Sequence, residues 1–420
     1  MAEIRVLSSA NRTMQRLGYL KRLVRRVVAL STSSLDNLGH DLVQTVMRRV
    51  RVPLTRERVI YVRQRLFDRT YNNLKRQASA WSGEGGEITV ALELQDLYLA
   101  DPLLPSQTGK LVRDDWRHYP PLGVGLGLVR AGTYSANTRG LSLLYFTSEG
   151  ELEAFLDYRP ETNPLHIGRP QALLFLYSLL ENDGEVIAPL LCRLARETTE
   201  EFSEREAGDQ LPQIYRSLIG RHRRRLLSAD DRDRLEVLSR VADSIERWLG
   251  QPYTGAGSRE HNIRVRLEPY SDIGLLAKPD SFHYRYNFSQ AGRIWAESLQ
   301  GVESNEQVAD FLATQFFATA AKAWEIPAEI ASDSAPDIIV AHLYRGWEGI
   351  QSVGGYAPIQ EMALVAGIEA LLDHGLVIEP GVAREAIIAY QKANPYKVRF
   401  TVNRMGVLAH ARFLEPPADH

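Results

Sequence analysis

The last sixty residues place two apolar helical segments in front of a strand pair, and this order constrains the fold more than any other feature. Residues 358–375 form a strongly apolar helical segment, and residues 381–393 form a second one that Asn394 and Pro395 end. Residues 397–413 then alternate polar and apolar side chains around a glycine-containing turn. We therefore expect a β-hairpin that packs behind two helices.

The same order appears twice earlier in the chain. Residues 259–274 have helical spacing, with Pro269 as a kink or restart, and short strands are predicted at 275–277 and 282–288. Apolar runs at 124–130 and 140–146 flank a Gly/Ser/Asn-rich segment, which predicts a further hairpin. The three segments share no fixed period, so a solenoid is not expected.

The middle segment resembles the recognition helix and wing of winged-helix domains, from Leu267 through Gly274 and Tyr286 to Gly292. In layout the chain is similar to winged-helix proteins carried in bacterial genome-defence operons. This resemblance implies a mainly α fold with small β-hairpins, in which multiple winged-helix-like units accompany a helical insert and a basic N-terminal helical arm. The expected boundaries are 1–82 for the arm, 83–166 for the first unit, 167–300 for the insert and second unit, and 301–420 for a helical segment and third unit.

Composition agrees with a globular chain of several domains. Of 420 residues, 44% are hydrophobic and 24% charged, which argues against disorder, and a single cysteine excludes a disulfide scaffold. No apolar run is long enough to span a membrane and no signal peptide is apparent, so we expect a cytoplasmic protein without a membrane partner. Within 167–300 four helices are expected, at 170–182, 186–196, 214–227 and 229–249.

The near-neutral net charge of −2 hides a basic N-terminal segment. Residues 1–80 contain 17 Lys and Arg against 5 Asp and Glu, so the remainder is net acidic. Three interpretations stay open for this arm: a helical arm docked on protein, contact with a nucleic-acid backbone, and an interfacial membrane helix. The arginines that suit phosphate contact are Arg22, Arg25, Arg26, Arg63, Arg65 and Arg69.

The three predicted units carry further candidate DNA-binding residues. Arg259, Asn262 and Arg266 share one stripe of the helix at 259–274, and arginine and asparagine suit guanine and adenine edges. The predicted hairpins and loops add candidates for phosphates or the minor groove: Arg139, Lys278, Arg285, Lys397, Arg399 and Arg404. The basic cluster at 221–225 has two interpretations, which are intramolecular ion pairs and a second phosphate-contacting patch.

Motifs of catalysis are missing from the sequence. There is no phosphate-binding loop, nucleophile elbow or His-Glu-x-x-His motif, and one cysteine excludes a multi-thiolate zinc site. Paired carboxylates such as Asp114 and Asp115 fit helix starts better than a metal site. We therefore expect no enzyme activity, no cofactor and no bound metal.

These observations predict a non-enzymatic DNA-binding protein, an accessory or recognition subunit of a multi-protein bacterial assembly in genome or antiviral defence. The expected partners are double-stranded DNA and other protein subunits, and a homo-oligomer is an open alternative. Because residues 81–420 are net acidic, a protein-interaction scaffold of the chromosome-organising type is the second hypothesis. An unrecognised metal-dependent nuclease is the third.

Overall fold

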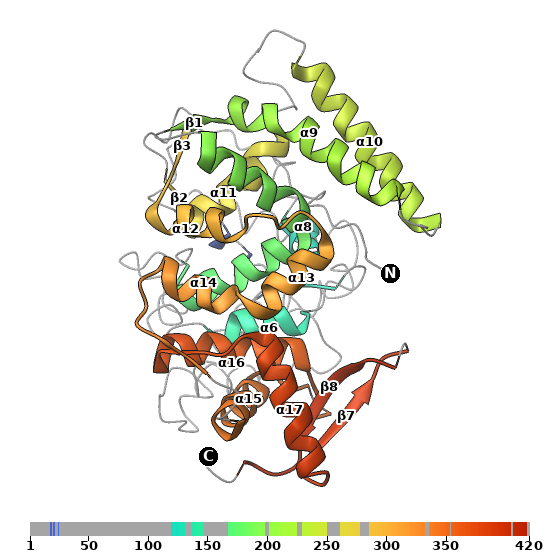
Figure 1. Ribbon diagram of the computed structural model, residues 1–420. Coiled ribbons are helices and arrows are strands. Elements are labelled where there is room, and N and C mark those ends of the chain that lie inside the picture. Colours follow the sequence, from blue (N-terminus) through green and yellow to red (C-terminus); the bar gives the residue numbers. More distant parts are fainter. Residues whose placement is uncertain are drawn as a thin grey trace, which may run out of the picture. The chain divides into compact units, whose positions relative to one another are not determined.

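The computed structural model describes ten stretches and five residues between Leu17 and Val24. The stretches are 119–130, 136–146, 167–197, 201–224, 229–249, 261–277, 285–331, 336–352, 354–404 and 406–417. This part of the chain is mainly helical with small sheets, as the sequence predicts (Figure 1). It divides into two compact units, a middle unit within Phe175–Ile326 and a flanking unit formed by Leu17–Leu174 and Pro327–His420.

The middle unit contains a three-stranded antiparallel sheet. Its elements are α8 (Arg169–Glu197, whose first residues belong to the flanking unit), β1 (Phe202–Ser203), α9 (Glu204–Arg223), α10 (Ala229–Leu249), α11 (His261–Asp272), β2 (Leu276–Ala277), β3 (Arg285–Phe288), α12 (Gln290–Ser298), α13 (Asn305–Thr314) and α14 (Phe316–Ala323). The strand order is β1–β3–β2, so the predicted strand pair after α11 is present. Trp295 is buried in the core and its ring contacts those of Phe311 and Phe316.

The flanking unit contains a second three-stranded antiparallel sheet. Its elements are α5 (Tyr119–Gly125), α6 (Thr138–Tyr145), β4 (Glu329–Ile330), α15 (Pro336–Ile350), β5 (Ala357–Pro358), α16 (Ile359–His374), β6 (Leu376–Val377), α17 (Pro380–Ala393), β7 (Val398–Val402) and β8 (Leu408–Phe413). The strand order of the antiparallel sheet is β5–β8–β7, and β4 and β6 form a separate parallel pair. The two helices and the hairpin predicted at the C-terminal end are confirmed.

The two units repeat one order of elements. From α8 to β3, and again from α15 to β8, a helix leads to a short strand, then to further helices and finally to a strand pair. The flanking unit adds β6 between α16 and α17, and this strand pairs with β4. In both sheets the short first strand pairs with the last strand, which therefore lies in the centre. The middle unit has one extra helix in this order, α10, which packs along α9 (Figure 1).

The hairpin predicted over 124–146 is wrong. Residues 140–146 belong to or follow helix α6, because the side chain of Asn137 accepts a hydrogen bond from the Thr138 N–H and caps the helix. Strand pairing in this stretch is limited, over the described residues, to one bridge between Val129 and Ala136. The helix is favoured over the hairpin because α6 places Leu143 and Leu144 together on a buried face.

Two of the predicted helices in the insert are one helix. We expected a break at residues 182–184, but α8 runs through them. The side chain of Asn182 donates to the Ser178 carbonyl within the helix, and Asp183 pairs with Arg266. Gly184 lies within this helix and packs closely on Val308: a Cβ at this position would lie 2.7 Å from the Val308 side chain. The glycine thus serves close packing rather than helix termination.

Only a short part of the predicted basic arm is described. Leu17, Leu20 and Val24 are buried, as is Lys21, and the described residues from 18 to 24 are helical. All six candidate arginines of the arm lie outside the described residues: Arg22, Arg25, Arg26, Arg63, Arg65 and Arg69.

Candidate nucleic-acid interface

Helix α17 packs one face on helices α15 and α16 of the flanking unit and exposes the other face to solvent. Glu379 precedes the helix and Pro380 occupies its first turn, where proline is well tolerated. Ala383 and Ile387 are buried against α15 and α16. Arg384 and Lys392 are exposed and stand eight residues apart, which places them on one stripe of the helix.

The β7–β8 hairpin follows α17 directly, and its register decides which side chains reach solvent. Val398 pairs with Phe413, and both are buried. The ring of Phe413 lies 5.3 Å from that of Tyr344 and 5.6 Å from that of Trp347, both on α15. This packing holds the inner face of the hairpin on the helices and turns the other face outward.

The outward face carries two arginines directly opposite each other. Arg399 on β7 pairs in register with Arg412 on β8. Like charges at directly opposed positions of an antiparallel pair destabilise it. The Arg412 guanidinium lies 5.9 Å from the centre of the Tyr356 ring, whereas Arg399 is exposed and has no ion pair with any described residue. A bound anion would relieve this repulsion.

The turn of the hairpin has a defined shape. The Asn403 N–H donates to the Val407 carbonyl at 2.8 Å, and the Asn403 side chain accepts from the Val407 N–H at 3.0 Å. Gly406 closes the loop with a φ of 76°, a left-handed value that favours glycine. Arg404 is exposed in this turn.

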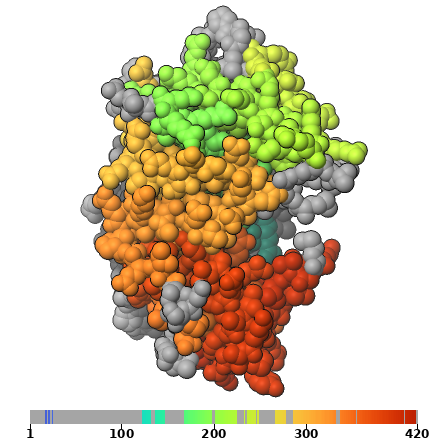
Figure 2. Space-filling view, viewed as in Figure 1, coloured from blue at the N-terminus to red at the C-terminus, as the bar shows by residue number. Residues whose placement is uncertain are grey.

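The surface formed by α17 and the hairpin is basic. The sequence from 380 to 417 contains six Lys and Arg and only two Glu. Among the described residues no carboxylate forms an ion pair with Lys392, Lys397, Arg399 or Arg404. Figure 2 shows the C-terminal part, in red, with its residues at the molecular surface. A surface of this charge attracts polyanions.

Three sequence-predicted candidates therefore lie together: Lys397, Arg399 and Arg404 occupy one hairpin. Sequence analysis missed Arg384, Lys392 and Arg412. The spacing of Arg384 and Lys392 along the predicted helix would have found the first two. Finding Arg412 required the strand register, which the alternation of residues 397–413 leaves open by one residue.

Arg139 is a corrected expectation. It lies on α6, is 5% exposed, and pairs with Glu361 on α16 through Nη2–Oε1 at 2.5 Å and Nε–Oε2 at 3.2 Å. A guanidinium buried in a two-pronged ion pair is unavailable to DNA.

Arg266 is corrected for the same reason. Its side chain on α11 is buried and holds Asp183 of α8 through Nε–Oδ2 at 2.7 Å and Nη2–Oδ1 at 3.2 Å. Burial, the largest single effect, lowers the pKa of this guanidinium, but the charge of Asp183, with Tyr215 and the hydrogen bonds to both, together raise it. Nearby, the Tyr286 hydroxyl donates to Glu268 at 2.8 Å. The inner part of α11 thus carries a buried polar network rather than a base-reading stripe.

The other candidates of the middle unit are placed only in part. Arg285 on β3 is exposed and lies 3.4 Å from Glu201, a pair too open to contribute much stability. Asn262 falls in α11, but its side chain lies outside the described atoms. Arg259 and Lys278 lie outside the described residues altogether.

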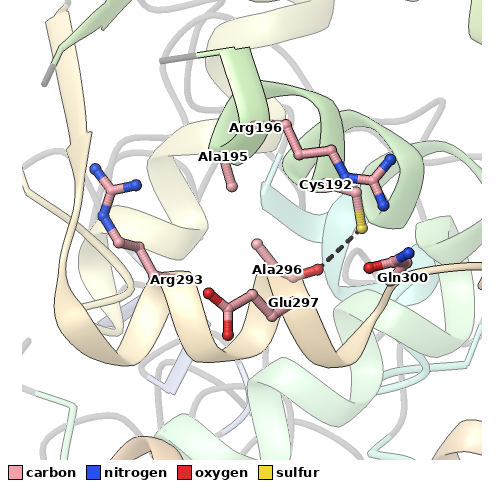
Figure 3. A pocket seen from close by; sticks show the side chains of 7 residues that line it. All are labelled: Cys192, Ala195, Arg196, Arg293, Ala296, Glu297 and Gln300. Carbon is pink, nitrogen blue, oxygen red and sulfur yellow. Dashed lines mark hydrogen bonds between the residues drawn. The ribbon is translucent and has the colours of Figure 1, made fainter. Parts of the chain in front are cut away.

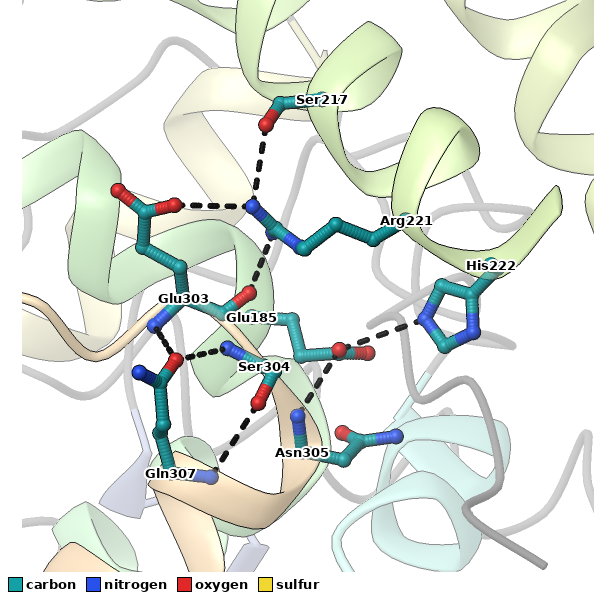
Figure 4. Close-up of polar contacts among 8 residues, drawn as sticks. All are labelled: Glu185, Ser217, Arg221, His222, Glu303, Ser304, Asn305 and Gln307. Carbon is teal, nitrogen blue, oxygen red and sulfur yellow. Dashed lines mark hydrogen bonds and ion pairs between the residues drawn. The ribbon is translucent and has the colours of Figure 1, made fainter. Parts of the chain in front are cut away.

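The basic cluster at the end of α9 forms intramolecular contacts. Arg221 donates to Ser217 at 3.0 Å and to the Glu303 carboxylate at 2.9 Å (Figure 4). Glu185 is buried below it, accepts from the Asn305 N–H at 2.9 Å and lies 3.4 Å from His222 Nε2. Arg221 therefore forms an intramolecular ion pair, but with the remote Glu303 and not at helical spacing, and Arg223 remains exposed.

A small pocket lies in the middle unit beside the buried Cys192. Its volume is about 110 Å³, and Arg196, Arg293 and Glu297 are among its lining residues (Figure 3). The Cys192 thiol donates to the Ala296 carbonyl at 3.0 Å, and burial raises the pKa of this thiol to about 11. A thiol protonated at neutral pH is a poor nucleophile. In the described stretches, no three His, Cys, Asp or Glu side chains gather as metal ligands.

Comparison of the chain with protein-family models, with curated proteins and with solved structures finds no match. The described helices include none that is both long and apolar enough to cross a membrane.

Proposed function

We propose that the chain is a non-enzymatic DNA-binding protein and that residues 336–413 form a winged-helix module whose α17 and β7–β8 hairpin contact the duplex. The observation that carries this proposal is the basic outward face of a hairpin held directly after a helix. Arg399 and Arg412 oppose each other there, and the cations at Lys397 and Arg404 extend the same surface. A polyanion is the partner that relieves such a concentration of positive charge.

The order of elements supports the winged-helix interpretation. The order α15, β5, α16, β6, α17, β7 and β8, with β8 in the centre of the three-stranded sheet, puts the last helix directly before the hairpin in sequence. A helix of this kind fits the major groove, while the hairpin reaches the backbone beside it. Arg384 and Lys392 then face the DNA from α17, and Lys397, Arg399 and Arg404 face it from the hairpin.

The middle unit repeats this order but supports a different role. Its last helix, α11, uses Arg266 and Glu268 for buried contacts. We therefore place DNA contact in the flanking unit and propose protein contacts for the middle unit. The role of an accessory subunit in a bacterial genome-defence assembly rests on the resemblance of layout.

The test is the salt dependence of binding to a duplex of about 30 bp, measured by fluorescence anisotropy. If several phosphate contacts carry the binding, the association constant should fall by at least ~10-fold between about 50 and 200 mM salt. The triple variant Lys397→Ala, Arg399→Ala and Arg404→Ala should lower the slope of log K against log salt by about 2 to 3. Its matched control removes three exposed cations of the middle unit: Arg205, Arg232 and Lys322.

The control variant should bind like the wild type. If the hairpin variant and the control variant lose DNA affinity equally, net charge and not this surface sets the affinity. Absence of binding at low salt would overturn the proposal.

Protein docking through the same hairpin is the second candidate function. Tyr396 is 87% exposed and Leu414 is 38% exposed, and the Leu414 N–H donates to the Lys397 carbonyl beside Tyr396. Exposed apolar side chains that adjoin one another are typical of protein interfaces. Docking on protein is favoured if the purified chain fails to bind DNA while Tyr396→Ala abolishes its association with a partner subunit.

A further inference from the structure

Two large apolar side chains are exposed at the end of the β7–β8 hairpin. Val402 is 60% exposed and Val407 is 46% exposed, and they stand on either side of the turn at 403–406. Both belong to the small set of described large apolar residues that solvent reaches. Neither contributes to the core, which the hairpin reaches through Val398, Ala411 and Phe413.

The strand register changes at this point. Thr401 pairs with His410, but Val402 pairs with Leu408, which leaves Ala409 as an extra residue on β8. An extra residue of this kind forms a β-bulge, which increases the local twist and redirects the side chains beyond it. The bulge therefore separates the orientation of the tip from that of the part of the hairpin that packs on α15.

The tip is also held rigid. The two hydrogen bonds between Asn403 and Val407, and a third from the Gly406 N–H to the Asn403 carbonyl at 3.0 Å, close the turn. Valine has few side-chain rotamers, so Val402 and Val407 lose little conformational freedom when they are buried. A stiff apolar pair on a defined turn is suited to insertion into a narrow space.

The charges around the two valines indicate which partner the tip of the hairpin would enter. Arg404 lies between the two valines in sequence, and Arg399 lies three residues before Val402. No described carboxylate pairs with either arginine. Apolar side chains with flanking arginines match the minor groove of a duplex, where an apolar wedge can insert between two base pairs and arginines can reach the phosphates on either side.

We propose that the tip of the hairpin acts as a wedge: Val402 and Val407 enter the minor groove, partly unstack one base step, and bend the DNA. This inference rests on the proposed function and adds the mode of contact. Pyrimidine–purine steps such as TpA unstack most easily, so the wedge should favour duplexes that contain them.

The experiment measures bending separately from binding. A duplex of about 30 bp with a central TpA step carries a donor dye and an acceptor dye at its two ends, and energy transfer is recorded at saturating protein. The variant Val402→Thr with Val407→Thr keeps side-chain shape and removes apolar character. Its matched control, Ile330→Thr with Ile338→Thr, changes two exposed isoleucines of the same unit.

We expect wild type and control to raise the energy transfer equally. The valine variant should lose at least half of this increase and bind about tenfold more weakly, with an unchanged salt slope, because the phosphate contacts remain. Binding without a rise in energy transfer, or a valine variant that bends DNA like wild type, overturns the wedge and leaves the proposed function intact. No binding by the wild type at low salt overturns both.

Discussion

The contact between Arg266 and Asp183 gives a stability prediction that also separates a structural arginine from a DNA-binding one. The two side chains are 1% and 4% exposed and are joined by two hydrogen bonds, at 2.7 and 3.2 Å. Arg266→Met removes the cation, keeps most of the side-chain volume and leaves the Asp183 carboxylate buried without its partner. Breaking a buried ion pair in this way costs about 3–5 kcal/mol.

The assay is urea unfolding followed by circular dichroism. Arg285→Met serves as the control, because Arg285 is 62% exposed and its pair with Glu201 at 3.4 Å should contribute less than about 1 kcal/mol. The double variant Asp183→Leu with Arg266→Met removes both charges and should recover much of the loss, since two apolar groups can replace a buried pair. DNA affinity of the folded single variant should equal that of wild type.

The reasoning is refuted if Arg266→Met unfolds like wild type and at the same time lowers the salt slope of DNA binding. That result would mean that Arg266 reaches the phosphates.

Two further predictions concern close packing and burial. A Cβ on Gly292 would lie 1.9 Å from the Leu275 carbonyl oxygen, so Gly292→Ala should destabilise the protein by about 1–3 kcal/mol. Gly220→Ala, in a helix with nothing within 4 Å of the new Cβ, should instead stabilise it by about 0.5–1 kcal/mol; thermal melts that show the same sign for both would contradict the packing. Because its pKa is raised to about 11, the Cys192 thiol should react with iodoacetamide at pH 8 at least ~100-fold more slowly in the native protein than after unfolding. Comparable rates in the two states would show that the thiol is accessible and ionised.

Prediction succeeded where the sequence pattern fitted only one kind of element. Residues 359–374 adopt the expected helix because an apolar run of this length is too long for a single strand, and residues 398–413 adopt the expected hairpin because their side chains alternate with a period of two. The run at 140–146 satisfied both patterns, and the cap at Asn137 and burial of α6 decided for a helix. Gly184 indicated a helix end, but its neighbour Val308 lies more than a hundred residues away in sequence.

The candidate site shows the same limit. Lys397, Arg399 and Arg404 were found because a hairpin sets the face of each side chain by simple alternation. Arg139 and Arg266 failed because their partners, Glu361 and Asp183, are remote in sequence. Charge patterns along the chain give the number of cations, whereas only tertiary packing determines which of them are neutralised.

The position of β7 in its sheet has a consequence for how the purified chain behaves. With the order β5–β8–β7, this five-residue strand lies at the border of the sheet, and no strand in the described part of the chain pairs with its outer row of backbone groups. A second copy of the chain would find there a template for intermolecular pairing and aggregation, and charged side chains on such a strand prevent it by mutual repulsion. Lys397 and Arg399 provide such charges beside and on β7, so variants that neutralise them should be checked by light scattering for self-association before any loss of affinity is interpreted.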